Sequence, residues 1–153
     1  MILKRPELDL LEFLPYLINR VGVALVERFT HDALSGTHLT IGTWRLLVVM
    51  WNHDGIRQVD LARLTSIEVS TVSRLVTRLI RLGLVNRSRS TKSNREVTVR
   101  LTPKGKGLVA SLVPIAVDLE RTATRGVSKK DVAAIKRILR QMHENLERRE
   151  PLR

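Results

Sequence analysis

Cysteine is absent from this chain of 153 residues, and aromatic residues are scarce. Without cysteine the protein has no disulfide, no thiol redox sensor and no zinc site built on thiolates. Aromatic residues make up only 3% of the sequence, so the core has to be assembled from leucine, valine and isoleucine. No apolar run approaches the roughly 18 residues of a membrane span. The N-terminal residues also lack the features of a signal peptide, so we expect no membrane partner and a cytoplasmic location.

Positive charge is what the chain has in excess. It carries 27 lysine and arginine residues against 15 aspartate and glutamate residues, a net charge of +12. Between Ile56 and Lys106, twelve basic residues oppose three acidic ones, which gives 12 − 3 = +9 for that third of the chain. Such a concentration predicts a polyanionic partner, with double-stranded DNA as the first candidate. The alternative is a basic surface that only keeps the protein soluble.

Residues 57–102 predict a short helix, a turn, a second helix and a two-stranded ribbon. The two helices are expected over Gln58–Leu64 and Ser70–Leu82, and Gly83 ends the second. At about 100° per residue, the second helix has an apolar side that consists of Val72, Leu75, Val76, Leu79 and Leu82. Its opposite side carries Arg74, Arg78 and Arg81, with Ser70, Thr71 and Thr77. A helix that buries one side and presents arginine and hydroxyl groups on the other suits the major groove of DNA.

The ribbon is predicted from alternation and turn composition. Its first strand starts at Leu84 and Val85, and its second strand alternates apolar Val97, Val99 and Leu101 with polar residues. The tip between them, Ser90–Asn94, is polar and carries Lys92.

Helices are also expected on both sides of this segment. Residues 8–34 predict one long helix with an apolar stripe, and Thr40 is the expected N-cap of a helix that runs to about Asn52. Thr102 and Pro103 begin another helix, which Pro114 should kink. In the last helix, Ser128 and Asp131 resemble a capping box, and its apolar stripe consists of Val132, Ile135, Leu139, Met142 and Leu146.

The terminal helices thus carry apolar stripes that a motif of about 65 residues cannot cover. Packing against a second copy of the chain would bury them, which predicts a homodimer. An intramolecular three-helix bundle in a monomer is the alternative.

Three segments resemble the MarR-type bacterial transcriptional regulators: LTIGTWRLLVVM, LARLTSIEVSTVSRLVTRLIRLGLV and REVTVRLTPKGKGL. The resemblance covers nearly the whole chain and implies a mainly α fold with a small β-wing. It implies a winged helix-turn-helix DNA-binding domain at residues 37–102 and a helical dimerisation region formed by both termini, residues 1–36 and 103–153. It also implies a homodimeric repressor that binds a pseudo-palindromic operator and is released by a small ligand.

The resemblance and the helix pattern together give a set of candidate DNA-contacting residues. Arg95 matches the family's minor-groove arginine, but Ser93 stands where the family has an acidic residue that braces the wing. Arg74 and Arg78 are alternatively solvated helix charges, and for Arg87 and Arg89 the equal alternative is that they solubilise an edge strand. The full set is Ser70, Thr71, Ser73, Arg74, Thr77, Arg78, Arg81, Arg87, Arg89, Lys92 and Arg95.

The ligand of this family usually binds between the dimerisation helices and the DNA-binding lobe. Arg20 or Arg45 would hold a carboxylate, and Trp44 and Tyr16 would offer aromatic walls, although Trp44 is alternatively plain core. The candidate ligand-binding residues are Tyr16, Asn19, Arg20, His38, Trp44 and Arg45. The resemblance suggests aromatic acids, phenols or their coenzyme A thioesters as ligands.

Other functions are poorly supported by the sequence. The four histidines are scattered, so we predict no metal site and no cofactor. No catalytic triad, paired carboxylates or phosphate-binding glycine loop is visible, so we predict no enzymatic activity. The remaining alternative is an architectural protein that coats DNA without a ligand.

Overall fold

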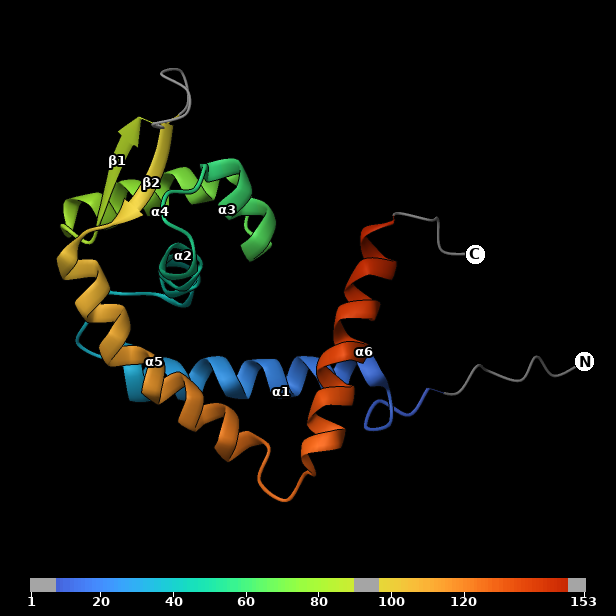
Figure 1. Cartoon of the computed structure of the whole chain (residues 1–153). Coiled ribbons are helices and arrows are strands. Elements are labelled where there is room, and N and C mark those ends of the chain that lie inside the picture. The colour runs from blue at the N-terminus through green and yellow to red at the C-terminus, as the bar shows by residue number, and fades with distance from the viewer. Residues whose placement is uncertain (1–7, 90–96, 149–153) are drawn as a thin grey trace, which may run out of the picture. The chain divides into compact units, whose positions relative to one another are not determined.

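The computed structural model describes residues 8–89 and 97–148 of the chain. The chain divides into two compact units, Met1–Leu119 and Glu120–Arg153 (Figure 1). The first unit contains α1 (Leu14–Phe29), the π-helix η1 (Thr30–Leu34), α2 (Ile41–Asn52), α3 (Gln58–Thr65), α4 (Val69–Arg81), β1 (Val85–Arg89), β2 (Val97–Leu101) and most of α5 (Pro103–Ala123). The second unit contains the end of α5 and α6 (Lys129–Glu147). This mainly helical fold with one small antiparallel sheet confirms the predicted fold class.

The long helix predicted over residues 8–34 is shorter in the structure. Residues 8–13 form turns, in which the Asp9 carboxylate accepts a hydrogen bond from the backbone N–H of Leu11 at 2.9 Å. Helix α1 begins only at Leu14, with Pro15 in its first turn, where a missing N–H costs little. At the other end, η1 follows α1 directly, with its hydrogen bonds widened to the π pattern. An apolar stripe in the sequence indicates neither the later start of the helix nor the change to π-helical hydrogen bonding.

The three helices that follow were predicted closely. Thr40 caps α2: its hydroxyl accepts from the N–H of Thr43 at 3.3 Å, while the Thr43 hydroxyl accepts from the N–H of Thr40 at 2.8 Å. Helix α3 ends one residue later than predicted, and its C-cap Ser66 has a left-handed φ of 54°. Helix α4 starts at Val69 and is followed by Gly83, whose φ of 71° explains why glycine stands there.

The sheet consists of β1 and β2, paired with Val85 opposite Leu101 and Arg89 opposite Val97. Ile56 extends it on the other side of β2 through two hydrogen bonds to Val99, of 3.1 and 2.9 Å. The predicted alternation in the second strand is correct for Val99 and Leu101 but wrong at its start. There Val97 is 50% exposed and Thr98 is buried, because the Thr98 hydroxyl pairs with Ser88 at 3.3 Å.

Helix α5 begins as predicted, since the hydroxyl of Thr102 accepts from the N–H of Gly105 at 3.1 Å and Pro103 occupies the first helical position. The helix continues through Pro114. In the second unit, Ser128 caps α6 by accepting from the N–H of Asp131 at 3.1 Å. The Asp131 carboxylate accepts from the Ser128 hydroxyl instead of reaching back to the backbone, so only half of a capping box forms.

The core lies in the first unit and is almost entirely aliphatic, as the composition predicts. Its fully buried side chains come from α2, α3, α4, β1, β2 and α5, and include Leu46, Leu47, Leu61, Val76, Leu79, Val99 and Val109. Phe29 and Trp44 add one tilted aromatic pair with ring centroids 5.1 Å apart. This core holds α4 in place, and α4 carries the candidate site.

Candidate nucleic-acid interface

Helix α4 has the two sides that its sequence predicts. Val72, Val76 and Leu79 are completely buried, and their burial fixes the rotation of the helix about its axis. The opposite side carries the seven predicted contact residues of α4. Ser70, Ser73, Arg74, Arg78 and Arg81 are exposed, while Thr71 and Thr77 are half-buried at its edges. None of the three guanidinium groups is packed inside the subunit.

Hydrogen bonds orient several of these side chains. Arg74 donates from Nη2 to the Thr71 hydroxyl at 3.1 Å, one turn earlier on the same helix. Arg87 of β1 donates from Nη2 to the Thr77 hydroxyl at 3.4 Å, which connects the wing to α4. Arg78 donates to the main-chain carbonyl of His38 at 2.7 Å. The basic side of α4 is therefore partly ordered before any ligand binds.

The wing adds one described arginine, Arg87, beside α4. Arg87 is exposed on β1. The predicted contacts at Lys92 and Arg95, and the predicted loss of an acidic brace at Ser93, lie outside the described residues, as does the side chain of Arg89.

A second arginine of the sheet attaches β2 to the loop between α2 and α3. Arg100 lies 3.5 Å from the Asp54 carboxylate and packs over Gly55. A β-carbon at residue 55 would come within 2.8 Å of Arg100 Nε, and Gly55 itself has a left-handed φ of 90°. The sheet is thus anchored on both sides, to α4 by Arg87 and to this loop by Arg100.

The first turn of α5 holds the turn that follows α4. Thr102 donates from its hydroxyl to the Gly83 carbonyl at 2.7 Å, and Lys104 donates to the Leu82 carbonyl at 2.9 Å. The backbone N–H of Thr102 also donates to the Leu84 carbonyl at 3.0 Å. The C-terminal end of α4, the start of the wing and the start of α5 therefore form one connected joint.

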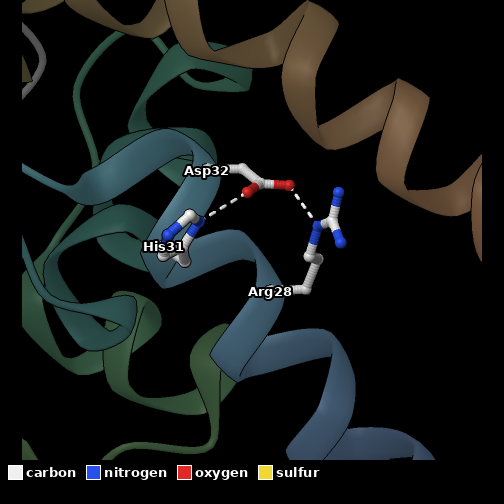
Figure 2. Close-up of polar contacts among 3 residues, drawn as sticks. All are labelled: Arg28, His31 and Asp32. Atoms are coloured by element: carbon white, nitrogen blue, oxygen red, sulfur yellow. Dashed lines mark hydrogen bonds and ion pairs between the residues drawn. The ribbon is translucent and has the colours of Figure 1, made fainter.

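Two aspartates of the first unit are held in their charged form by neighbouring basic side chains. The pKa of Asp60 on α3 is lowered chiefly by a hydrogen bond from Arg57, at 2.7 Å, with Arg63 adding a weaker attraction. In η1, Asp32 accepts hydrogen bonds from His31, at 2.8 Å, and from Arg28 (Figure 2). Both hydrogen bonds lower the pKa of Asp32, and the bond from His31 makes the largest contribution. Both acids neutralise arginines that would otherwise add to the positive surface.

An open cavity of about 480 Å³ lies among α2, the end of α3 and α5. Two of the six predicted ligand-binding residues, Trp44 and Arg45, line it. Arg45 is exposed, whereas Trp44 is 8% exposed and belongs to the core through Phe29, as its alternative interpretation holds. The other lining residues were not predicted: Val48, Val49, Leu64, Thr65, Ser66 and Ala116. An apolar helix face has the same sequence pattern whether it packs in the core or lines a cavity, so the sequence could not identify these residues.

The remaining predicted ligand residues do not line this cavity. On α1, Arg20 lies over the ring of Tyr16, 5.7 Å from its centroid, and Asn19 is exposed. His38 is exposed in the segment before α2, with a left-handed φ of 59°. Four candidates thus lie outside the cavity that the structure describes, and a ligand role for them stays a prediction.

The apolar stripes of α1 and α6 are largely exposed, whereas the stripe of α5 packs on the core of the first unit, where Leu112 is buried. On α1, Leu14 is 52% exposed and Val21 is 57% exposed, and α6 has no buried residue. Among the described helices, none is long and apolar enough to cross a membrane.

This arrangement of α2, α3, α4 and a two-stranded wing defines a winged helix-turn-helix protein. The family model of the MarR family matches residues 39–97. A MarR family transcriptional regulator from Silicibacter pomeroyi is 30% identical in sequence, with a TM-score of 0.80 over 89% of this chain and 91% of that one. The chain belongs to the MarR family, whose members are transcriptional regulators and not enzymes.

Two further relatives carry functional information. The solved structure of Bordetella bronchiseptica BpsR, whose DNA binding is regulated by 6-hydroxynicotinic acid, is 26% identical, with a TM-score of 0.80 over 90% of this chain and 98% of that one. The HTH-type transcriptional regulator TtmR of Methylorubrum extorquens is 31% identical over 81 residues, 53% of this chain. That match spans only 42% of the length of TtmR.

Proposed function

We propose that this protein is a homodimeric, sequence-specific DNA-binding repressor, released from its operator by a small aromatic or anionic ligand. The observation that carries the proposal is α4. On its apolar side Val72, Val76 and Leu79 are fully buried, and its serine and arginine side is exposed, beside a basic wing anchored to the same helix. A protein that acts on chromosomal DNA in this way is expected in the cytoplasm.

We assign the contacts by position along α4. The N-terminal residues of a recognition helix reach the base edges, which favours Ser70, Thr71, Ser73 and Arg74 as readers of sequence. Arg81, near the C-terminal end, is suited to the phosphate backbone. Thr77, Arg78 and the wing residues Arg87, Arg89, Lys92 and Arg95 complete the proposed contact set, with Arg95 in the minor groove.

The proposed dimer uses residues 1–36 and 103–153 of both copies. Exposed leucine, isoleucine and valine side chains on α1 and α6 support it, because a soluble protein rarely leaves such stripes uncovered. A two-fold dimer would present two α4 helices to two half-sites of a pseudo-palindrome, roughly 34–36 Å apart.

A footprint on DNA selected by the protein, combined with analytical ultracentrifugation, tests the proposal. We expect a dimer at micromolar concentration and protection confined to a pseudo-palindromic site in the presence of competitor DNA. Uniform coating with a steep dependence on salt would indicate the architectural alternative. A monomer would contradict the proposed dimer.

We further propose that an aromatic acid occupies the cavity lined by Trp44 and Arg45. The cavity has mostly apolar walls, and Arg45 is an exposed guanidinium on its lining that is suited to a carboxylate. Regulation of BpsR by 6-hydroxynicotinic acid supports this ligand class by analogy.

A thermal-shift screen of aromatic acids checks the cavity. A ligand that binds the folded state at 100 times its Kd stabilises it by about 2.7 kcal/mol, so a hit should raise the melting temperature. We expect Arg45→Ala to reduce the shift given by a hit, and Arg63→Ala, which removes an exposed arginine of α3, to leave it unchanged. A shift that is equal in both variants would exclude Arg45 as the carboxylate partner.

A further inference from the structure

The guanidinium group of Arg78 connects the recognition helix to a distant part of the main chain. Its Nη2 donates to the carbonyl oxygen of His38, 40 residues earlier in the sequence, at 2.7 Å. Arg74 on the same helix donates instead to Thr71, a residue of its own helix. The two arginines lie on the same side of α4 in the sequence pattern but are held by different partners.

The acceptor of this bond is held firmly by its own segment, residues 35–40. The Thr37 hydroxyl donates to the Leu34 carbonyl at 2.7 Å and accepts from the backbone N–H of Leu39 at 3.2 Å. Leu39 is buried, and Thr40 caps α2. Between these residues the backbone of His38 takes a left-handed φ of 59°, which only a few per cent of non-glycine residues adopt. This conformation helps to direct the His38 carbonyl to Arg78.

The donor is held equally firmly from the other side. Val76 and Leu79, two residues before and one residue after Arg78 on α4, are completely buried. Leu75 packs so closely on the start of α2 that a β-carbon at Gly42 would lie 3.2 Å from its Cδ1. The bond thus joins α4 to the segment before α2, next to the point where Leu75 of α4 packs on the start of α2.

We infer that Arg78 is a positioning residue, which fixes the recognition helix α4 to residues 35–40 and does not read bases. The inference rests on the proposed function for its DNA part. One N–H of the guanidinium is committed to the His38 carbonyl, and Arg78 lies a full turn beyond Arg74, away from the N-terminal turns that reach base edges. Its remaining N–H groups are available to a phosphate, which carries no sequence information.

Four variants test the inference from both ends of the bond. Arg78→Ala removes the donor, and Arg81→Ala is the matched control, an exposed arginine of the same helix. His38→Val disfavours the left-handed backbone that directs the carbonyl, whereas His38→Gly accepts it. Both His38 variants lose the same imidazole, so loss of the imidazole does not account for a difference between them.

The first measurement is hydrogen–deuterium exchange of peptides over residues 35–43 and 69–81 in the absence of DNA. We expect Arg78→Ala and His38→Val to increase exchange over residues 35–43 by roughly two- to twelvefold, the range that corresponds to the net contribution of one typical intramolecular hydrogen bond. Arg81→Ala and His38→Gly should match the wild type. Unchanged exchange in both Arg78→Ala and His38→Val would overturn the inference, whatever the protein binds.

The second measurement is affinity for the operator and for a set of its single-base-pair variants. We expect Arg78→Ala and His38→Val to weaken binding to all of them by the same factor. A loss of discrimination at one base pair in Arg78→Ala, but not in His38→Val, would show that Arg78 reads a base and overturn the inference. If the wild-type protein does not distinguish the operator from other DNA, the proposed function is wrong. The exchange measurement still decides whether Arg78 positions α4.

Discussion

Gly105→Ala should lower the free energy of unfolding by about 1–3 kcal/mol, the usual cost of forcing an extra carbon into a packed site. A β-carbon at Gly105 would lie 2.1 Å from the carbonyl oxygen of Leu84 and 3.1 Å from its carbonyl carbon. This oxygen accepts the N–H of Thr102 at 3.0 Å, and the N–H of Leu84 donates to Leu79 at 3.0 Å. The obstacle is a backbone segment pinned at both ends, so it cannot move without breaking the joint between α4, the wing and α5.

Gly107→Ala is the matched control on the same helix. A β-carbon at Gly107 has nothing within 4 Å, and alanine is a better helix former than glycine by about 0.8–1.0 kcal/mol. Urea denaturation should therefore show that Gly105→Ala lowers the free energy of unfolding and that Gly107→Ala raises it. The two variants should differ in this free energy by about 2–4 kcal/mol. Equal stability of Gly105→Ala and Gly107→Ala would contradict the close packing of α5 on Leu84.

Arg74→Ala should weaken binding to the specific operator by about 1–3 kcal/mol, which corresponds to roughly 5- to 150-fold in Kd. Arg74 is exposed near the N-terminal end of α4, and its hydrogen bond to Thr71 orders the guanidinium before DNA binds. An ordered arginine can donate two hydrogen bonds to one guanine, at O6 and N7, and truncation of the side chain leaves both acceptors unpaired. Affinity for scrambled DNA should fall much less.

Arg81→Ala is the control for charge, since it removes one exposed arginine from the same helix. We expect it to weaken operator and scrambled DNA alike and to reduce the slope of log K against log salt by about 1. Titrations of both variants at several salt concentrations separate the two roles. If Arg74→Ala loses the same factor on both DNA sequences, Arg74 does not read bases.

The recognition helix is the part of the site that could be predicted from sequence. The order of Val72, Val76 and Leu79 against Arg74, Arg78 and Arg81 repeats with the period of a helix, and burial follows that period directly. The cap at Thr40, the turn at Gly83 and the restart at Thr102 and Pro103 were predictable for the same reason. Each depends on residues only a few positions apart.

Some local features were predicted wrongly because two local preferences compete. The apolar stripe of residues 8–34 suggested one helix, but the Asp9 side chain takes a backbone N–H and Pro15 favours a helix start, so α1 begins at Leu14. In β2, the alternation predicted Val97 inside, but Thr98 is buried because it finds a hydroxyl partner on β1.

The candidate cavity and the joints of the site could not be predicted. The cavity combines Arg45 of α2 with Ser66 after α3 and Ala116 of α5. The bond from Arg78 to His38 spans 40 positions and uses a main-chain carbonyl, which every residue possesses and no sequence pattern marks. The close approach of Gly105 to Leu84 is equally invisible in the sequence.

By itself, then, the sequence determines that this chain forms a winged helix-turn-helix with one strongly basic helix side. Periodicity, capping residues and charge are properties of short segments, and they act before any long-range contact forms. Only the tertiary structure decides which arginine is oriented by its own helix, which is tied to another segment, and where a cavity opens. These features depend on how α2, α4 and α5 pack on one shared core, and that packing is set by contacts between residues far apart in the chain.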